Sequence, residues 1–384
     1  MDKYDTLRAE TRFQWKVHGN IYAYMEYEGI SLHEYYTDVD AVIQLYRNGR
    51  RKQREIFGDD VSLPDVGTPD ISYGHVSGIG APLRFPPGDG EAAVERMFDG
   101  LAEAVAYMDR HAEVDFAKSG VIPRYLEFRN RLQEAFPGEP VRFGFSGQGP
   151  VTTAFLLNGE KIFYELYDDP DLLATYLGQL TRSENAYHRF VRRDIFGMDP
   201  VHPTYAYLAD DAAAFVPPDF FPTHVLPFWE EQYRARTATG ERELHCEGLA
   251  RPQLKFVERM GVDYFDPSIS PLLIPPIVAE EIRVPFLWRL ASFHLWSMTP
   301  EEISDFVYHL VADGASGTFL VLTQDMSEGM NLRKVQAYIS ACKESVRVLE
   351  AGGSRSDVRS LATVKSGPAF WANWDGYKGQ GGAR

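Results

Sequence analysis

Three side chains that could bind a metal or move a proton stand together in the segment Leu244–Gly248, which reads LHCEG. We interpret this segment as the end of a strand, because a helix-like run follows it. Side chains alternate along a strand, so His245 and Glu247 are expected to point to one side and Cys246 to the other. A histidine and a carboxylate on one side are half of a site for zinc or another divalent metal. The alternative is a hydrogen-bonded His–Glu pair.

Residues able to complete such a site stand at the ends of other predicted strands. If the strands are parallel, their carboxyl ends meet at one edge of the sheet, where the active sites of α/β barrels lie. The polar residues expected there, besides His245 and Glu247, are Ser146, Gln148, Asp210, Asp211, Asp266, Arg289, Gln324 and Asp325. Asp325 or Gln324 is the best placed to supply further metal ligands. We expect Ser146 and Gln148 to bind substrate.

Asp210 and Asp211 end one of these strands, and two roles compete for them. An acid at a strand end can cap the following helix, which explains at least one of the pair. The other would face the site as a hydrogen-bond acceptor or a general acid or base. Arg289 is an unusual residue for an apolar strand unless it meets an acidic partner or a substrate carboxylate. Asp210, Asp211 and Arg289 are therefore candidate catalytic residues.

Two aromatic residues and a cysteine have a structural explanation beside a functional one. Trp288 and His294 lie in an aromatic-rich stretch that could line an apolar substrate pocket, but aromatics at such density are more often part of the core. Cys342 lies in the last long predicted helix, where we expect a buried structural thiol.

Composition narrows the classes of partner. The 384 residues carry a formal net charge of −16, which argues against binding to nucleic acid or to an anionic membrane surface. No run approaches the roughly 20 apolar residues of a membrane span. The first residues show no apolar signal-peptide region, and two cysteines make no disulfide framework, so we expect a reduced, cytoplasmic protein.

The second half of the chain alternates short apolar runs with helical patterns. The predicted strands are Val141–Gly147, Thr204–Asp210, Arg242–Gly248, Val262–Ser268, Val284–Ala291 and Gly317–Asp325. The predicted helices are Pro217–Thr237, Ala250–Gly261, Pro275–Arg283, Thr299–Gly314 and Asn331–Gly353. Within the fourth helix, Thr299, Pro300 and Glu302 form a helix-start pattern with a capping box.

This alternation predicts parallel strands joined by helical crossovers. With one or two further strands in the first 140 residues, the pattern favours a (β/α)8 barrel, a TIM barrel, as a single domain over residues 1–384. Extra N-terminal helices are expected over about residues 1–80 and a frayed tail over about 375–384. A doubly wound open sheet is the alternative, but no Gly-rich phosphate fingerprint follows any predicted strand.

The order of motifs resembles the uroporphyrinogen decarboxylase superfamily, which includes zinc-dependent, corrinoid-linked methyltransferases. The resemblance covers most of the chain and rests on five loose motifs whose order is similar to that of the family. They are Glu28–Asp60, Arg142–Leu157 with its Gly-Pro turn, Ala209–Glu231, Leu244–Ser268 and Gly317–Ala337. The resemblance implies a barrel fold. It also implies a zinc motif His-x-Cys-Gly in the fourth segment and a cysteine ligand in the fifth.

This sequence departs from both branches of the superfamily. True decarboxylases carry an arginine-rich stretch at the first strand, and Arg12–Gly29 lacks its pair of arginines, so porphyrinogen decarboxylation is not expected. Against the methyltransferase motif, His245 matches the histidine, Glu247 replaces the cysteine, and Gln324 or Asp325 replaces the second cysteine. Zinc still accepts such ligands, and fewer thiolates make it a stronger Lewis acid.

The resemblance therefore implies a metal-dependent methyltransferase that acts on the demethylating side of a corrinoid system. A small O-methylated donor, such as a methoxylated aromatic, would pass its methyl group to cobalamin carried by a separate corrinoid protein. Two alternatives remain open. One is a metal-independent decarboxylase or lyase that uses Asp210 or Asp211 and Arg289, and the other is a non-catalytic ligand-binding relative. A homodimer is a common default for enzymes of this size.

Overall fold

The structure, a computed structural model, describes residues 2–363, 369–372 and 374. The tail predicted to fray, 375–384, lies outside these residues. The chain divides into two compact units. The first comprises Met1–Gly29, Gln44–Pro64 and Glu247–Arg384, and the second comprises Ile30–Ile43 and Asp65–Cys246. We describe each unit by itself, and the single domain expected over the whole chain stays a prediction.

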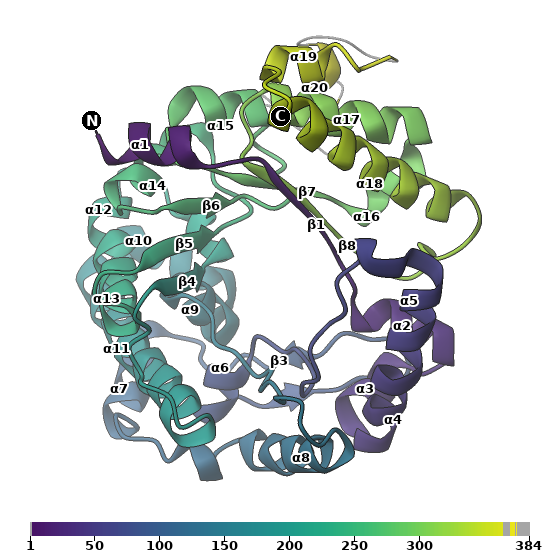
Figure 1. Cartoon of the computed structure of the whole chain (residues 1–384). Helices are drawn as coiled ribbons and strands as arrows, with labels where there is room; N and C mark the ends of the chain where they lie inside the picture. Colours follow the sequence, from purple (N-terminus) through teal and green to yellow (C-terminus); the bar gives the residue numbers. More distant parts are fainter. Residues whose placement is uncertain (1, 364–368, 373, 375–384) are drawn as a thin grey trace. The chain divides into compact units, whose positions relative to one another are not determined.

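Parallel strands form the centre of the first unit. β8 (Gly317–Val321) lies between β1 (Gln14–His18) and β7 (Leu287–Leu290) and pairs with both in parallel, as Figure 1 shows. β6 (Tyr264–Asp266) joins β7 through a parallel bridge between Phe265 and Phe286. The strand β1 lies within residues 1–80, where extra N-terminal helices were expected, and falls among the further strands expected in the first 140 residues.

Helices α17 and α18 pack against each other and against α19 in the first unit. The predicted capping box of α17 is confirmed, because the Thr299 side chain accepts from the backbone N–H of Glu302 and the Glu302 side chain accepts from that of Thr299. The helices of this unit are α1 (Lys3–Glu10), α2 (Ile21–Glu28), η1 (Leu45–Gly49), α5 (Arg50–Phe57), η2 (Gly58–Asp60), η7 (Arg251–Gln253), α14 (Lys255–Arg259), α15 (Pro275–Glu281), α16 (Ser292–Ser297), α17 (Pro300–Ala312), α18 (Gly329–Glu350), α19 (Arg355–Arg359) and α20 (Ala369–Ala372).

In the second unit, β4 (Tyr205–Ala209) and β5 (Glu241–His245) pair in parallel, and β2 (Leu83–Arg84) pairs antiparallel with β3 (Ala93–Val94). The predicted strand Val141–Gly147 forms two isolated parallel bridges, Gly67 with Arg142 and Ile71 with Phe145, instead of a continuous strand.

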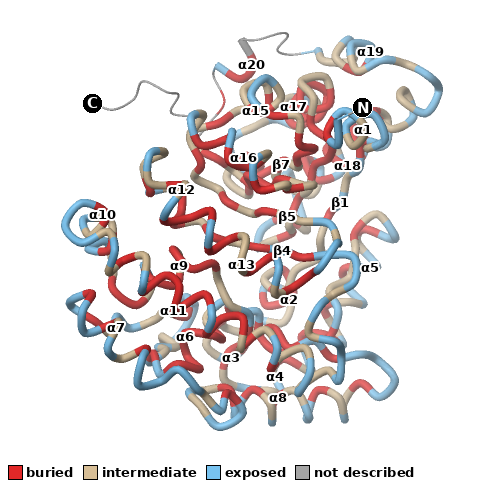
Figure 2. Tube along the Cα trace, turned by 90° about the vertical axis from the view of Figure 1, so that its left-hand side faces the viewer, coloured by how far each residue is buried: buried red, intermediate tan, exposed pale blue. Residues whose placement is uncertain are grey.

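The helix α11 is the longest of the second unit and contacts α7, α9 and α13. Figure 2 shows that its inward turns, like those of α9, are buried. The helices of this unit are α3 (Leu32–Thr37), α4 (Val39–Gln44), α6 (Gly74–Gly78), α7 (Leu101–Arg110), η3 (Phe116–Lys118), α8 (Ile122–Ala135), α9 (Pro150–Asn158), η4 (Gly159–Phe163), α10 (Glu165–Asp168), α11 (Pro170–Arg189), η5 (Phe190–Ile195), η6 (Asp211–Phe215), α12 (Phe221–His224) and α13 (Leu226–Arg236). The last residue of α4, Gln44, belongs to the first unit.

The chain is thus an α/β protein with parallel strand pairs, as predicted. Among the described residues the strands pair into separate sheets. This pairing does not show a closed eight-stranded barrel. Two predicted helices differ in their bounds. The helix expected from Pro217 starts at Phe221 and is broken at Val225, and the one expected over Ala250–Gly261 is a 3₁₀ turn followed by the short α14.

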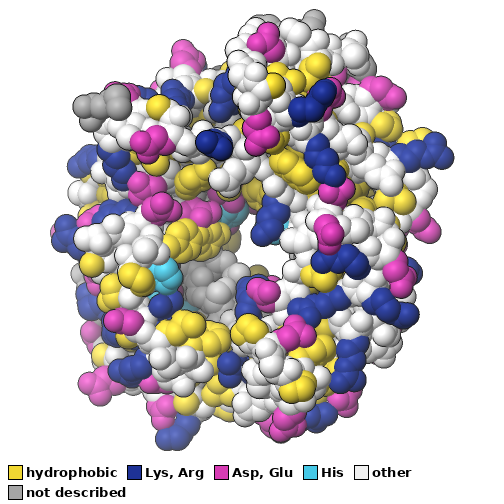
Figure 3. All heavy atoms as spheres, viewed as in Figure 1, with side chains coloured by type: hydrophobic (Ala, Val, Ile, Leu, Met, Phe, Trp, Pro, Cys, Tyr) yellow, Lys and Arg dark blue, Asp and Glu magenta, His cyan; other side chains and the backbone are white. Residues whose placement is uncertain are grey.

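Charged side chains of both signs are interspersed over the face that Figure 3 shows. Within the described residues, no helix has the length and apolar character needed to cross a membrane.

Candidate functional site

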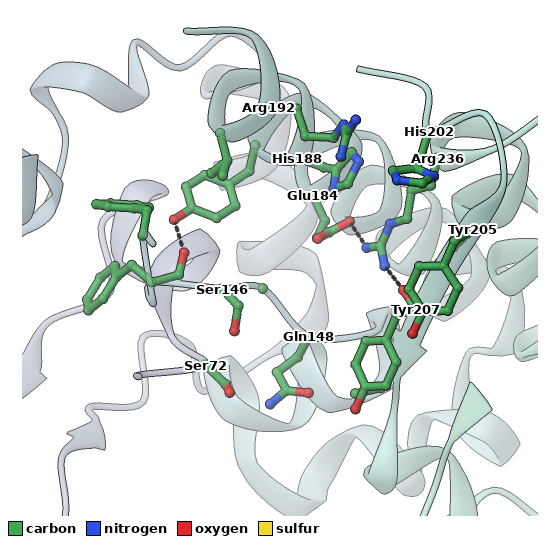
Figure 4. A pocket seen from close by; sticks show the side chains of 17 residues that line it. Ser72, Ser146, Gln148, Glu184, His188, Arg192, His202, Tyr205, Tyr207 and Arg236 are labelled. Carbon is green, nitrogen blue, oxygen red and sulfur yellow. Dashed lines mark hydrogen bonds and ion pairs between the residues drawn. The ribbon is translucent and has the colours of Figure 1, made fainter. Parts of the chain in front are cut away.

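The second unit contains a cavity of about 360 Å³ (Figure 4). Its wall is built from the bridged segment 143–148, from α11 and η5, from residues 202–209 in and before β4, and from the last turn of α13. The lining residues are Ser72, Phe143, Phe145, Ser146, Gly147, Gln148, Glu184, Tyr187, His188, Val191, Arg192, His202, Tyr205, Ala206, Tyr207, Ala209 and Arg236. Ser146 and Gln148, which were predicted to bind substrate, are therefore in its wall.

Much of the cavity wall is aromatic. Tyr205 and Tyr207 are two apart on β4, so they point to the same side of the strand. They are 38% and 41% exposed although most residues of their kind are buried, which leaves their rings available to a ligand. Tyr187 is fixed in the wall because its hydroxyl donates to the carbonyl of Phe145 at 2.5 Å. A flat apolar molecule would be in contact with ring faces on several sides.

A buried ion pair crosses one end of the cavity. The Arg236 guanidinium donates to Glu184 at 2.5 Å and to the carbonyl of Tyr207 at 2.5 Å. Gln232 donates to the same carboxylate oxygen at 3.1 Å. Arg236 is 8% exposed and Glu184 4%, so the two charges neutralise each other away from water and fix α11, α13 and β4 in one geometry.

Three polar atoms of the cavity wall are buried and have no hydrogen-bond partner among the described residues: Gln148 Oε1, His188 Nε2 and Arg236 Nε. An unsatisfied buried polar group costs about 1–3 kcal/mol, so three of them around one cavity indicate a binding surface rather than core. Burial, together with the nearby charges of Arg236 and Arg192, lowers the pKa of His188 to about 3, so this ring is neutral at physiological pH.

His245 lies beside the cavity at the end of β5. Its Nε2 is 3.7 Å from the Asp211 carboxylate, and its ring centroid is 6.4 Å from that of Tyr207, which lines the cavity. The strand ends at His245, and Glu247 lies in the following turn. The alternation expected to place these two side chains on one side therefore does not apply. Cys246 is buried, as expected, with its thiol against the Asp210 carbonyl at 3.3 Å.

Asp210 has no exposed surface, and its carboxylate accepts hydrogen bonds from α13 and from the start of α9. It accepts from Trp229 Nε1 at 2.7 Å, from the Thr152 backbone N–H at 2.7 Å and from that of Val151 at 3.4 Å. It therefore caps α9, which precedes it in the chain, instead of the following helix that the sequence suggested. Gly149 permits this approach, because a Cβ there would lie 2.4 Å from Asp210. In this geometry the Asp210 carboxylate holds the start of α9, and its catalytic role stays a prediction.

The charge of Asp210 gives a prediction for stability against pH. Burial raises the pKa of Asp210 to about 6, although its donors oppose that shift. An unfolded aspartate titrates near 3.8, so the folded state holds the proton more tightly and loses stability as pH rises towards and through 6. Between about pH 4.5 and 7 the unfolding free energy should fall by about 2 kcal/mol relative to Asp210→Asn. Urea unfolding of both proteins at each pH measures this difference, and parallel pH profiles would contradict it.

The remaining predicted site residues belong to the first unit. Trp288 and His294 are 0% and 1% exposed, so they pack in the core of that unit, and their role in substrate binding stays a prediction. Arg289, on β7, has a buried Nε to which the described part of the chain gives no hydrogen-bond partner. Its charge contributes, after burial and Lys16, to lowering the pKa of His18 to about 4. Gln324 and Asp325 are exposed after the end of β8.

The described residues contain no group of three or more His, Cys, Asp or Glu side chains that could hold a metal ion. Sequence reasoning also missed most of the cavity. Glu184, His188 and Arg192 recur every fourth residue along α11 and η5, and such a polar ridge on a largely buried helix was the available signal. Arg236 and His202 gave no comparable pattern.

Comparison with known proteins shows which solved structure has a similar fold. No protein-family model and no curated protein matches the chain. Among solved structures, a methyltransferase from Methanosarcina mazei is similar with a TM-score of 0.62 and 18% sequence identity. The match covers 89% of this chain and 97% of that one. The two proteins share a fold over nearly their whole lengths.

Proposed function

We propose that the protein is a methyltransferase that moves a methyl group between a small O-methylated donor and a corrinoid carried by a separate protein. The observation that carries this proposal is the cavity of the second unit. Its volume is in the range of small-molecule sites, its wall is aromatic, and its unpartnered polar atoms are suited to orienting a ligand. The fold shared with a methyltransferase supports the same reaction class. We further propose the complete barrel and membership of the uroporphyrinogen decarboxylase superfamily.

The resemblance also implies zinc or another divalent ion, with His245, Glu247, Asp325 and Gln324 as ligands, and we retain this ligand set as a proposal. The described residues do not fit it as they stand, since they contain no group of three potential ligands. In the second unit, His245 Nε2 lies 3.7 Å from the carboxylate of Asp211. The proton transfer by His245 and Asp211 requires no metal.

The His245–Asp211 pair can serve the departing oxygen of the donor. When the methyl–oxygen bond breaks, the oxygen keeps the electron pair and needs a proton. His245 Nε2 can donate that proton, and the carboxylate of Asp211 stabilises the charged imidazole before transfer. A corrinoid on its carrier protein supplies the nucleophile that receives the methyl group. Tyr207 and Gln148 hold the donor ring at the same end of the cavity.

Incubation with cob(I)alamin and a panel of methoxylated aromatic compounds tests this proposal. We expect methylcobalamin, followed by its absorbance, from at least one donor, together with one equivalent of the demethylated phenol. Parallel reactions with added zinc and with a chelator determine whether a metal takes part. If no donor yields methylcobalamin, with or without zinc and with either free or protein-bound corrinoid, the proposal is wrong.

A decarboxylase remains the second candidate because the buried Nε of Arg289 has no hydrogen-bond partner, as a site for a substrate carboxylate requires. Release of carbon dioxide from a carboxylated compound, insensitive to chelators and abolished in Arg289→Gln, would favour it over methyl transfer.

A further inference from the structure

We propose that the cavity of the second unit binds its ligand in one orientation, as a small aromatic monoanion whose negative group lies against Arg192 and His202. The inference depends on the proposed function only for the identity of the opposite end, which would carry the methyl group. The anion-binding end itself follows from the charges, hydrogen bonds and backbone geometry of the cavity.

The cavity carries one uncompensated positive charge. Its charged lining residues are Glu184, Arg192 and Arg236, and the first and last neutralise each other. Arg192 donates through Nε to the backbone carbonyl of Asp199 at 2.7 Å, and the described part of the chain gives it no ion pair. Its two terminal nitrogens are therefore available. A positive cavity in a chain of net charge −16 indicates selection for an anion.

The tautomer of His202 adds a neutral donor beside this arginine. Its Nδ1 accepts the backbone N–H of Thr204 at 3.2 Å, so in the neutral ring the proton is on Nε2. Figure 4 shows His202 on the same side of the cavity as Arg192 and His188. A carboxylate there could accept from both the guanidinium and the imidazole, which recognises an anion better than a point charge alone.

Arg192 stands in a π-helical turn of the cavity wall. The helix α11 ends at Arg189 and continues as the π-helix η5, over Phe190–Ile195. Within this wider turn, Val191 and Arg192 line the cavity, while the next residue, Arg193, forms an exposed ion pair with Asp194 at 2.7 Å. Such π-turns are found frequently at functional sites. Two adjacent arginines thus have different surroundings.

The opposite end of the cavity has the groups that a reacting end requires. Figure 4 places Ser146, Gln148 and Tyr207 away from Arg192 and His202. Tyr207 is in turn the neighbour of His245. From Tyr205 to Ala209, β4 rises about 13 Å at about 3.3 Å per residue, and both residues line the cavity. A benzene ring with para substituents can span this wall with its anion at one end and its ether at the other.

Binding of a matched pair of ligands tests the orientation. Para-methoxybenzoate and para-methoxybenzyl alcohol have the same ring and ether but differ in charge. By calorimetry, the wild-type protein should bind the benzoate about tenfold more tightly or better. Arg192→Gln should bring the two affinities within about twofold of each other, whereas Arg193→Gln, the matched control beside it, should retain the preference.

Equal affinity of the wild-type protein for both compounds, binding of neither, or a preference that survives in Arg192→Gln would overturn the inference. If Arg192→Gln does not fold, Arg192→Lys and the salt dependence replace it, because the preference should persist in the lysine variant and weaken with added salt. These measurements need no corrinoid. A charge preference without methyl transfer would therefore count against the proposed function alone, and methyl transfer without the preference against this inference alone.

Discussion

Replacement of Glu184 by alanine should lower the free energy of unfolding by about 3–5 kcal/mol, because it leaves the charge of Arg236 buried without compensation. The pair is 2.5 Å apart, and its side chains are 10% and 6% exposed. Gln232 also loses its acceptor, since it donates to the same carboxylate. The effect is measured by urea unfolding, and Glu184→Gln should recover part of the loss by keeping an acceptor for Gln232.

Glu230 supplies a matched control in the same unit. It pairs with Arg234 and Arg242 at 2.6 Å each, but its side chain is 29% exposed and Arg234 is 77% exposed. Glu230→Ala should therefore cost about 1 kcal/mol or less. If both variants lose the same small amount, water reaches the Glu184–Arg236 pair and the cavity wall is less rigid than described. Replacing both partners by apolar residues, in Glu184→Leu with Arg236→Met, should restore much of the loss.

Elements with strong local signals could be predicted from the sequence. The helix α17 begins where Thr299 and Glu302 form their capping box, since capping depends on residues within one turn. The apolar runs of β4, β7 and β8 were also found. In contrast, β1 has the mixed sequence QWKVH and is a strand because β8 pairs with it over its whole length. That partner is about 300 residues away, so no local window indicates it.

In the candidate site, too, some residues could be predicted from local patterns and others depend on tertiary packing. Ser146 and Gln148 line the cavity and His245 lies beside it, and all three were predicted by the strand-end rule, which requires only the order of elements. An acid at this strand end was expected to cap the following helix, but Asp210 caps α9, where its bonded residue Thr152 stands 58 positions earlier in the chain. Sequence alone cannot tell which helix start lies beside a strand end. The Glu184–Arg236 pair likewise depends on how α11 and α13 pack.

The strand-end rule failed at Glu247 for a physical reason. It assumes that the extended backbone continues past His245, whereas the chain turns there and Cys246 is buried against Asp210. A pattern two residues long cannot tell a strand from the turn that ends it. The residue type still suits a metal, so the ligand set containing Glu247 remains a proposal to be measured.

His245→Ala should reduce the rate of methyl transfer by about 100-fold or more, the range expected when a proton donor is removed from a reaction that needs it. His245 is 18% exposed and has Asp211 within 3.7 Å, so the pair can hold and deliver a proton at the end of β5. The loss should be smaller for donors that release an acidic phenol, such as a nitrophenyl methyl ether, because their oxygen departs without protonation. The rate of methylcobalamin formation with ordinary and nitro-substituted donors measures both effects.

His111→Ala is the control for this variant, because His111 is exposed, stacks on Tyr107 at 3.9 Å and does not line the cavity. It should keep wild-type activity. Elemental analysis of the same preparations separates two roles of His245. Loss of one zinc per chain together with activity identifies a metal ligand, whereas loss of activity with unchanged metal content and the dependence on phenol acidity identifies a proton donor. A His245→Ala protein as active as His111→Ala would exclude both roles, and the reacting end of the ligand would then have to lie elsewhere in the cavity.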